Sequence, residues 1–147
     1  MPSRRSLLVA SLICIVPFSL ALAGTAQASG TPDERALVQE INEARRSHGL
    51  HAVRQAAWIK RGARTYARFL LKRNLLVHAS VAGMAENLAW GTGSYRSPRA
   101  IVRRWLASPR HRAVLLWPPA RRIGIGLVDG SFQGHPSARV FVVRLAA

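Results

Sequence analysis

The sequence has little cysteine and little acid. Of its 147 residues, 22 are Lys or Arg, only 6 are Asp or Glu and one is Cys, which gives a formal net charge of +16. Such a charge favours acidic partners, including phosphates, anionic lipids, wall polymers and nucleic acid, without choosing among them. Because 49% of the residues are hydrophobic, the chain is too apolar for a disordered polyelectrolyte, and its length suits one compact domain.

The N-terminal segment has the features of a secretory signal peptide over residues 1–28. Arg4 and Arg5 precede an apolar run from Leu7 to Ala23, and small residues follow at Ala26-Gln27-Ala28. The run is shorter than the ~20 apolar residues that cross a bilayer, although an uncleaved anchor is the alternative. Paired arginines also occur in twin-arginine signals, so the general secretory and twin-arginine routes both stay open.

Cleavage after Ala28 would leave residues 29–147 as one domain that keeps all 6 acidic residues and loses only two basic ones, for a net charge of +14. The single cysteine, Cys14, lies in the apolar run and would be removed. The remaining chain then excludes disulfides, cysteine–zinc sites, iron–sulfur clusters and a cysteine nucleophile. We therefore predict a secreted or extracytoplasmic domain with no membrane span after cleavage.

Helix signals occupy the first two thirds of this domain. Thr31-Pro32-Asp33-Glu34 is a capping box with proline at the first helical position, and Gly49 supplies the stop. The buried stripe expected between them consists of Leu37, Ile41 and Ala44. A second helix is predicted over about Gln55 to Arg73, with an inward stripe of Ile59, Gly62, Tyr66, Phe69 and Leu70.

Two more helix starts are predicted at Ser97-Pro98 and Ser108-Pro109, since serine before proline is a common start. We expect the Ser108 side chain to cap its helix in preference to acting as a nucleophile. Residues 122–128 and 139–145 are rich in Val, Ile and Phe and are separated by a Gly, Ser and Pro loop, which predicts a β-hairpin or two strands. Helices followed by strands indicate an α+β domain.

Glu86 is the only acidic residue between Glu43 and Asp129, in a part of the chain where Lys and Arg are frequent. His78 precedes it by eight residues, within an apolar segment where a charged group needs a partner. The pair is therefore a candidate for chemistry. The alternatives are that Glu86 only pairs with an arginine or caps backbone amides, and that His78 is an ordinary satisfied histidine.

His111 is the second candidate, because Arg110 and Arg112 flank it. We expect their positive field to lower its pKa and keep the ring neutral, which is the form that ligates a metal or accepts a proton. The alternative is that His111 is a surface residue without a function.

Trp58 and Trp105 fall in helical segments and are expected in the core. They would then not be available to stack on bases, so nucleic-acid binding would depend on charge alone.

Glycines at 124 and 126 do not form a dinucleotide fingerprint, because Asp129 stands where the third glycine is needed. We expect a strand with spaced glycines at this position.

The order of these motifs resembles the CAP superfamily, also called SCP-like, which includes cysteine-rich secretory proteins, venom antigens and plant pathogenesis-related proteins. The resemblance implies an α-β-α sandwich, with helices on both faces of a small antiparallel sheet. It covers nearly all of residues 29–147. Its markers are Ile41-Asn42-Glu43-Ala44-Arg45 with Gly49-Leu50, Leu76-Val77-His78, Glu86-Asn87-Leu88-Ala89-Trp90-Gly91, Trp105 with Ser108-Pro109-Arg110-His111-Arg112, and Arg122-Ile123-Gly124-Ile125-Gly126.

The resemblance also implies a cleft with two histidines and one or two glutamates that bind zinc or another divalent cation. His78, Glu86 and His111 match three of these positions, and Ser108 stands at the usual second glutamate. Two histidines, one carboxylate and a water still form a reasonable zinc set. The missing acid and the neighbouring arginines, such as Arg110, should weaken cation binding.

Two functions of different classes follow. The first is a binding module for an anionic or amphiphilic ligand, either a cell-wall polymer, a lipid or a small amphiphile, through basic helix faces and this cleft. The alternative is a metal-dependent hydrolase of wall or lipid material, with Glu86 as ligand or general base. The resemblance names no shared reaction, and a fold does not fix a function. Export argues against nucleic acid as the partner.

Overall fold

The computed structural model describes residues 30–147, so the expected signal peptide and the first residue of the predicted domain lie outside the described part. None of the helices within residues 30–147 is both long and apolar enough to cross a membrane. The elements are, in order, α1 (Pro32–Ser47), β1 (Arg54–Gln55), α2 (Ala57–Arg73), β2 (Met84–Gly91), η1 (Gly93–Arg96), α3 (Pro98–Ala107), α4 (Pro109–Leu115), β3 (Arg122–Phe132) and β4 (His135–Ala146).

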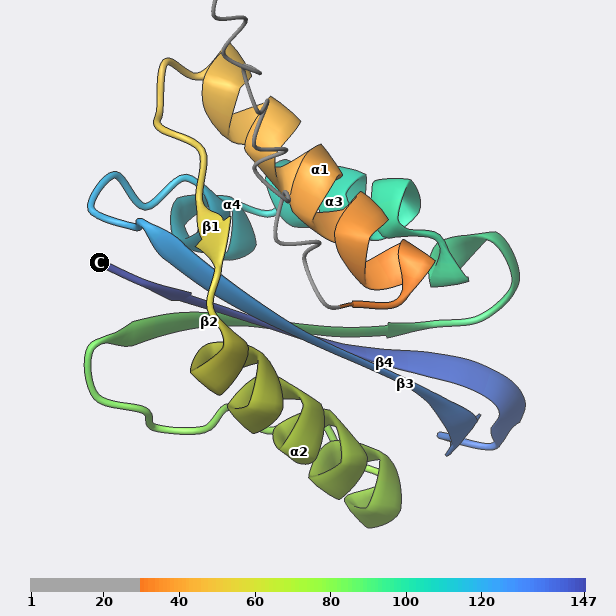
Figure 1. Cartoon of the computed structure of the whole chain (residues 1–147). Coiled ribbons are helices and arrows are strands. Elements are labelled where there is room, and N and C mark those ends of the chain that lie inside the picture. Colours follow the sequence, from red (N-terminus) through yellow and green to blue (C-terminus); the bar gives the residue numbers. More distant parts are fainter. Residues whose placement is uncertain (1–29) are drawn as a thin grey trace, which may run out of the picture.

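The helices lie on both faces of one sheet. Figure 1 shows α1, α3 and α4 on one side of the strands and α2 on the other. The first face packs over the larger cluster of buried side chains, which includes Leu37, Ile41, Trp105, Phe141 and Val143. The second packs over a smaller cluster, which includes Ala63, Leu70, Phe132 and Val142. This arrangement confirms the predicted α+β class and the α-β-α sandwich.

The sheet has the order β1-β3-β4-β2. β3 and β4 form the predicted hairpin, and β2 pairs antiparallel with β4 along its other side. The expectation of a purely antiparallel sheet needs one correction, because β1 pairs parallel with β3 through Arg54 and Arg122. This short pairing also explains why α2 begins at Ala57 and not at Gln55, since Gln55 is held in β1.

α1 follows its local sequence closely. The Glu34 amide donates to the Thr31 hydroxyl at 3.2 Å, and the Thr31 amide donates to the Glu34 carboxylate at 3.1 Å. Leu37 and Ile41 are fully buried, and Gly49 adopts a φ of 70° just after the helix end. The predicted capping box, stripe and stop are therefore confirmed.

α2 packs unusually close to the sheet because two glycines of β3 face it. A Cβ atom at Gly124 would collide with the backbone of Ile59, and one at Gly126 with the backbone of Ala63. The glycines therefore serve close packing between strand and helix, as expected for a strand with spaced glycines. The buried stripe of α2 consists of Ile59, Ala63, Ala67 and Leu70.

Two of the expected core aromatics lie on the outer side of α2. Phe69 is 46% exposed and Trp58 is 49% exposed, so the prediction that they face inward is wrong. The close approach between helix and sheet leaves room only for small or slim side chains on the inner stripe, and large rings are turned outward. Trp105 is buried as predicted and donates from its indole N–H to the Leu88 carbonyl at 3.2 Å.

Arg45, at the end of α1, is the largest fully buried side chain in the described residues. Its guanidinium donates to the carbonyls of His51, Leu115, Trp117 and Ala120, at 2.9, 2.8, 3.1 and 3.2 Å. Burial and the charge of Arg121 lower its pKa. A buried charge is tolerated only when its hydrogen bonds are satisfied, and four backbone carbonyls meet that need here.

Arg45→Met should lower the free energy of unfolding by about 3 kcal/mol or more, because it leaves several buried carbonyls without donors. Arg46→Met is the matched control, since Arg46 is exposed on the same helix turn. Urea unfolding of both variants beside the unaltered protein tests this expectation. Equal stability of the two variants would contradict it.

Candidate functional site

The loop after α2 carries His78 to the start of β2, where it meets Glu86. The His78 ring Nδ1 lies 3.0 Å from the Glu86 Oε1 atom, and the Ala79 amide donates to the same oxygen at 3.0 Å. Arg144 donates from Nε to the other carboxylate oxygen at 2.9 Å. The side chain of His78 is 61% exposed, whereas that of Glu86 is 7% exposed. The structure thus brings His78 and Glu86 together, with the carboxylate buried beneath the imidazole.

Arg144 is fixed on both sides. It is the register partner of Glu86 on the adjacent strand β4, and its guanidinium lies 4.8 Å from the centre of the Tyr66 ring of α2. Tyr66 in turn donates its hydroxyl to the Val77 carbonyl at 2.6 Å, beside His78. Burial, followed by the charge of Glu86, raises the pKa of Tyr66. This network holds the Glu86 carboxylate in one orientation.

His111 forms a second pair with Ser108 at the start of α4. The His111 Nδ1 atom lies 2.9 Å from the Ser108 Oγ atom. The prediction that Ser108 caps the helix with its side chain is wrong, since no cap hydrogen bond is made by it and the hydroxyl contacts the ring instead. Asn87 of β2 donates to the His111 carbonyl at 2.9 Å and ties α4 to the edge strand.

The pKa of His111 is lowered, as predicted, but the cause differs from the expected one. Burial is the larger contribution and the charge of His78 the second. The flanking residues Arg110 and Arg112 are exposed, so water screens their charges.

A cleft of about 300 Å³ opens at the β2 edge of the sheet, between β2 and α3. We call it the β2 cleft. His111 and Ser108 line it, whereas His78 and Glu86 do not. Six of its nine lining residues are apolar, and the only Lys or Arg among the nine is Arg104. The Arg104 guanidinium lies 5.0 Å from the centre of the Tyr95 ring. The lining residues are Leu76, Leu88, Ala89, Trp90, Ile101, Arg104, Trp105, Ser108 and His111.

Arg104 and Trp90 are not among the functional residues predicted from the sequence. In α3, Arg104 directly precedes Trp105, whose side chain is buried. This position next to an inward residue is the sequence signal that could have identified Arg104. Trp90 lies on a strand that has no alternating pattern, so its position at the cleft depends on the pairing of β2 with β4.

The predicted metal ligands form two pairs in this structure. Within residues 30–147, no three His, Cys, Asp or Glu side chains are grouped closely enough to hold a metal ion. Each histidine uses Nδ1 for a neighbouring oxygen, and among the described residues neither Nε2 atom has a hydrogen-bond partner. An imidazole whose Nδ1 is held by a carboxylate or hydroxyl is the usual form of a metal-ligating histidine. These residues fit a divalent cation through their donor types, and the metal site stays a prediction.

Comparison with known proteins places this geometry in a family. The family model described as "CAP: Cysteine-rich secretory protein family" matches residues 38–144. A search of curated protein sequences found no match. An outer surface protein from Borrelia burgdorferi has a similar structure, with 22% identity and a TM-score of 0.65, covering 78% of this chain and 91% of that one.

Two other solved structures show the same fold. Venom allergen-like protein 4 from Schistosoma mansoni is 13% identical with a TM-score of 0.61, and covers 80% of this chain and 89% of its own. An extracellular protein containing an SCP domain from Bacillus anthracis is 20% identical with a TM-score of 0.61, over 80% of this chain and 44% of its own. At these identities the structures support the fold alone, whereas the family match spans most of the sequence. The chain belongs to the CAP, or cysteine-rich secretory protein, family.

Proposed function

We propose that this protein is an extracytoplasmic CAP module that binds a small amphiphile with an anionic head group in the β2 cleft. The observation that carries the proposal is the lining of the cleft, in which apolar side chains form the walls and Arg104, Ser108 and His111 supply the polar groups. Ligand sites are commonly concave and mostly apolar, with a few polar groups that fix orientation. The alkyl chain of such a ligand would contact Trp90 and Leu88, and its anionic head group would contact Arg104. The ligand would then use both the apolar walls and the polar groups of the cleft.

The location proposed for this activity is outside the cytoplasm. The signal-peptide pattern of residues 1–28 supports it. The Bacillus anthracis protein is described as extracellular and the Borrelia burgdorferi protein as an outer surface protein, which agrees with this location. Wall polymer and anionic lipid are the larger ligands that share the required charge.

A metal-dependent hydrolase is the second candidate, and the free Nε2 atoms of His78 and His111 favour it. These two nitrogens would hold the ion, and a bound divalent cation supplies Lewis-acid activation of water or of a carbonyl. Glu86 has both oxygens engaged by protein groups, so its proposed role is to orient the His78 ring through Nδ1. Ser108 would orient His111 in the same way.

Decanoate binding should weaken roughly two- to fivefold in Arg104→Gln, because a partly exposed charge pair contributes ~1 kcal/mol or less. Binding of decanol, which has no charge, should stay unchanged in the same variant. Isothermal titration at low and high salt measures both ligands. Arg103→Gln is the matched control, since Arg103 is exposed on α3 and does not line the cleft.

A larger side chain at Ala89 tests the apolar part of the cleft. Ala89→Leu should weaken decanoate and decanol alike, because the added methyl groups occupy cleft volume. Binding that is unchanged in both Arg104→Gln and Ala89→Leu would exclude the β2 cleft as the site.

Zinc titration tests the metal prediction without an activity assay. His78→Ala and His111→Ala should abolish binding, and Glu86→Gln should weaken it roughly 10- to 100-fold, as expected for a residue that orients a ligand. Acidification should weaken zinc binding, because protonation removes the imidazole lone pair that binds the ion. The contribution of His111 should be lost at a lower pH than that of an ordinary histidine, because its pKa is lowered.

His135→Ala is the control for the zinc titration, since His135 is exposed on the hairpin. Thermal unfolding of each variant separates lost affinity from lost fold. Equal zinc affinity in the unaltered protein, His78→Ala and His111→Ala would refute the metal site. The hydrolase further requires that chelation and His111→Ala both abolish turnover of a lipid ester or wall fragment, and activity that survives both treatments would remove it.

A further inference from the structure

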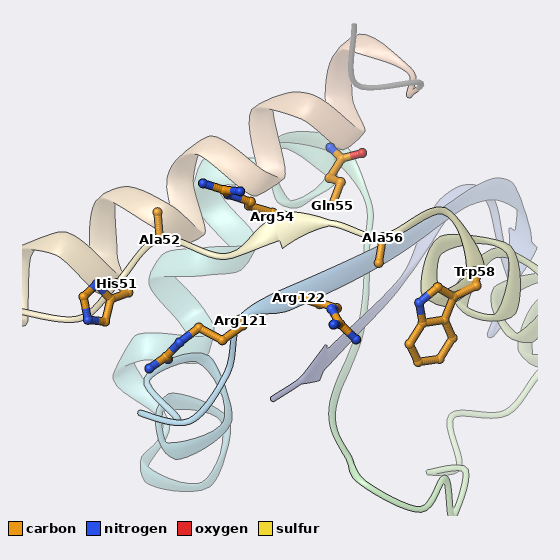
Figure 2. Close-up of a pocket in the computed structure, with 8 residues that line it drawn as sticks. All are labelled: His51, Ala52, Arg54, Gln55, Ala56, Trp58, Arg121 and Arg122. Carbon is orange, nitrogen blue, oxygen red and sulfur yellow. The ribbon is translucent and has the colours of Figure 1, made fainter. Parts of the chain in front are cut away.

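A second hollow lies at the β1 edge of the sheet, which is the edge opposite to the β2 cleft. It measures about 520 Å³, and we call it the arginine hollow. Figure 2 shows its side chains, which come from the segment before β1, from β1, from the start of α2 and from the start of β3. The lining residues are His51, Ala52, Arg54, Gln55, Ala56, Trp58, Arg121 and Arg122. Its volume is in the range of small-ligand sites.

The charge of the arginine hollow is uncompensated by protein groups. Among residues 30–147, no carboxylate lies within 4.0 Å of Arg54, Arg121 or Arg122. Arg54 and Arg122 are also register partners on the neighbouring parallel strands β1 and β3. All three arginines line the hollow, although Figure 2 shows their guanidinium groups pointing in different directions. Their shared effect is a positive field that favours an anion such as phosphate.

Five of the six acidic residues pair with basic groups outside the arginine hollow. Glu34 pairs with Lys60 and Arg64 on the buried side of α1, and Glu86 pairs with Arg144. Asp33 and Asp129 both pair with Arg139 at the far end of the hairpin. Glu40 pairs with Arg99, and Glu43 is the one acidic residue without an ion pair in the described chain.

The hollow is partly preorganised. Arg121 donates from Nη1 to the carbonyls of Pro118 and Ala120, at 2.8 and 3.0 Å, which fixes the position of its guanidinium. β1 is held to β3 by backbone hydrogen bonds from Arg54 to the Arg121 carbonyl and from Ala56 to the Ile123 carbonyl, both at 2.9 Å. The start of α2 adds to the positive field, since its first turn has no acidic residue and no side-chain cap.

Trp58 supplies a flat apolar surface beside these charges. Its ring is about half exposed at the rim, and in Figure 2 Arg122 lies between Arg121 and Trp58. Four buried residues form the inner stripe of α2, so Trp58 makes no contribution to that core. An exposed tryptophan next to an arginine is suited to stacking a ring whose attached phosphate contacts the Arg122 guanidinium group.

We propose that the arginine hollow binds a phosphate ester, with the phosphate at Arg122 in the positive field of Arg54 and Arg121, and a ring-shaped group stacked on Trp58. The ring is either a sugar or a nucleobase, and the phosphate is the chemistry common to both. This site shares no residue with the β2 cleft, so it is independent of the proposed amphiphile site.

The experiment titrates the protein with glucose 1-phosphate and with adenosine monophosphate, each beside its phosphate-free counterpart, glucose or adenosine. NMR resonances of the tryptophan indole N–H groups report binding, and a Trp58→Ala variant identifies the Trp58 signal. We expect at least one ester to shift the Trp58 signal saturably, and glucose and adenosine to bind at least tenfold more weakly. The tighter ester identifies the ring.

Two variants test the assigned contacts. The double variant Arg54→Gln and Arg122→Gln should weaken the bound ester by tenfold or more. Its charge-matched control is Arg68→Gln with Arg103→Gln, which removes two exposed arginines outside the hollow and should change the affinity less than twofold. Trp58→Ala should weaken the ester but leave the affinity for inorganic phosphate unchanged.

Three results would overturn the proposal. The first is that neither ester shifts the Trp58 signal. The second is equal weakening in the double variant and its charge-matched control, which would assign binding to net charge alone. The third is equal loss of ester affinity in Arg104→Gln, which would place the ester in the β2 cleft. Circular dichroism and thermal unfolding confirm that each variant is folded.

Discussion

The buried guanidinium of Arg45 is the interaction on which the arrangement of the sites depends. It has no carboxylate partner among the described residues and donates instead to four carbonyls from three separate segments of the chain. These carbonyls belong to the chain before β1, the end of α4 and the connection that leads into β3. One side chain therefore fixes where α4 ends and where β3 begins, and β3 is a central strand of the sheet.

The positions of the β2 cleft and the arginine hollow both depend on the contacts of Arg45. His111 lies one helical turn before Leu115, whose carbonyl Arg45 binds, so the histidine of the β2 cleft is placed from the end of α4. His51 lines the arginine hollow and offers its carbonyl to Arg45, and Arg121 directly follows Ala120. The proximity of Arg121 also lowers the pKa of Arg45. An anion in the hollow would relieve part of that repulsion, because it would offset the charge of Arg121.

The net charge has a structural meaning once the ion pairs are assigned. Five of the six acidic residues pair with basic side chains within the described chain. The acids are therefore used to join elements, as Glu34 joins α1 to α2 and Glu86 joins β2 to β4 and His78. The positive surplus remains at the surface, and at the arginine hollow it is concentrated in three neighbouring side chains.

The sequence predicted the features that depend on local interactions and missed those that depend on packing between distant segments. The capping box at Thr31, the stop at Gly49 and the hairpin were predictable, because their signals lie within a few residues. Strand β2 was not predictable from its local sequence, because its hydrogen bonds go to β4. The prediction that Trp58 faces the core fails because helical spacing alone cannot tell which side of α2 contacts the sheet. The predicted side-chain cap by Ser108 fails because the ring of His111 competes for the serine hydroxyl.

Glu86 shows how the structure refines a residue that its sequence context correctly singled out. Its isolation among basic residues suggested a metal ligand or an ion-pair partner, and both oxygens are engaged by protein groups. A carboxylate that already accepts from Arg144 and a backbone amide loses hydrogen bonds if it turns toward a metal, whereas it keeps them if it only holds the His78 Nδ1 atom. The arrangement therefore favours orientation of the imidazole over direct ligation, because orientation needs no existing contact to be broken.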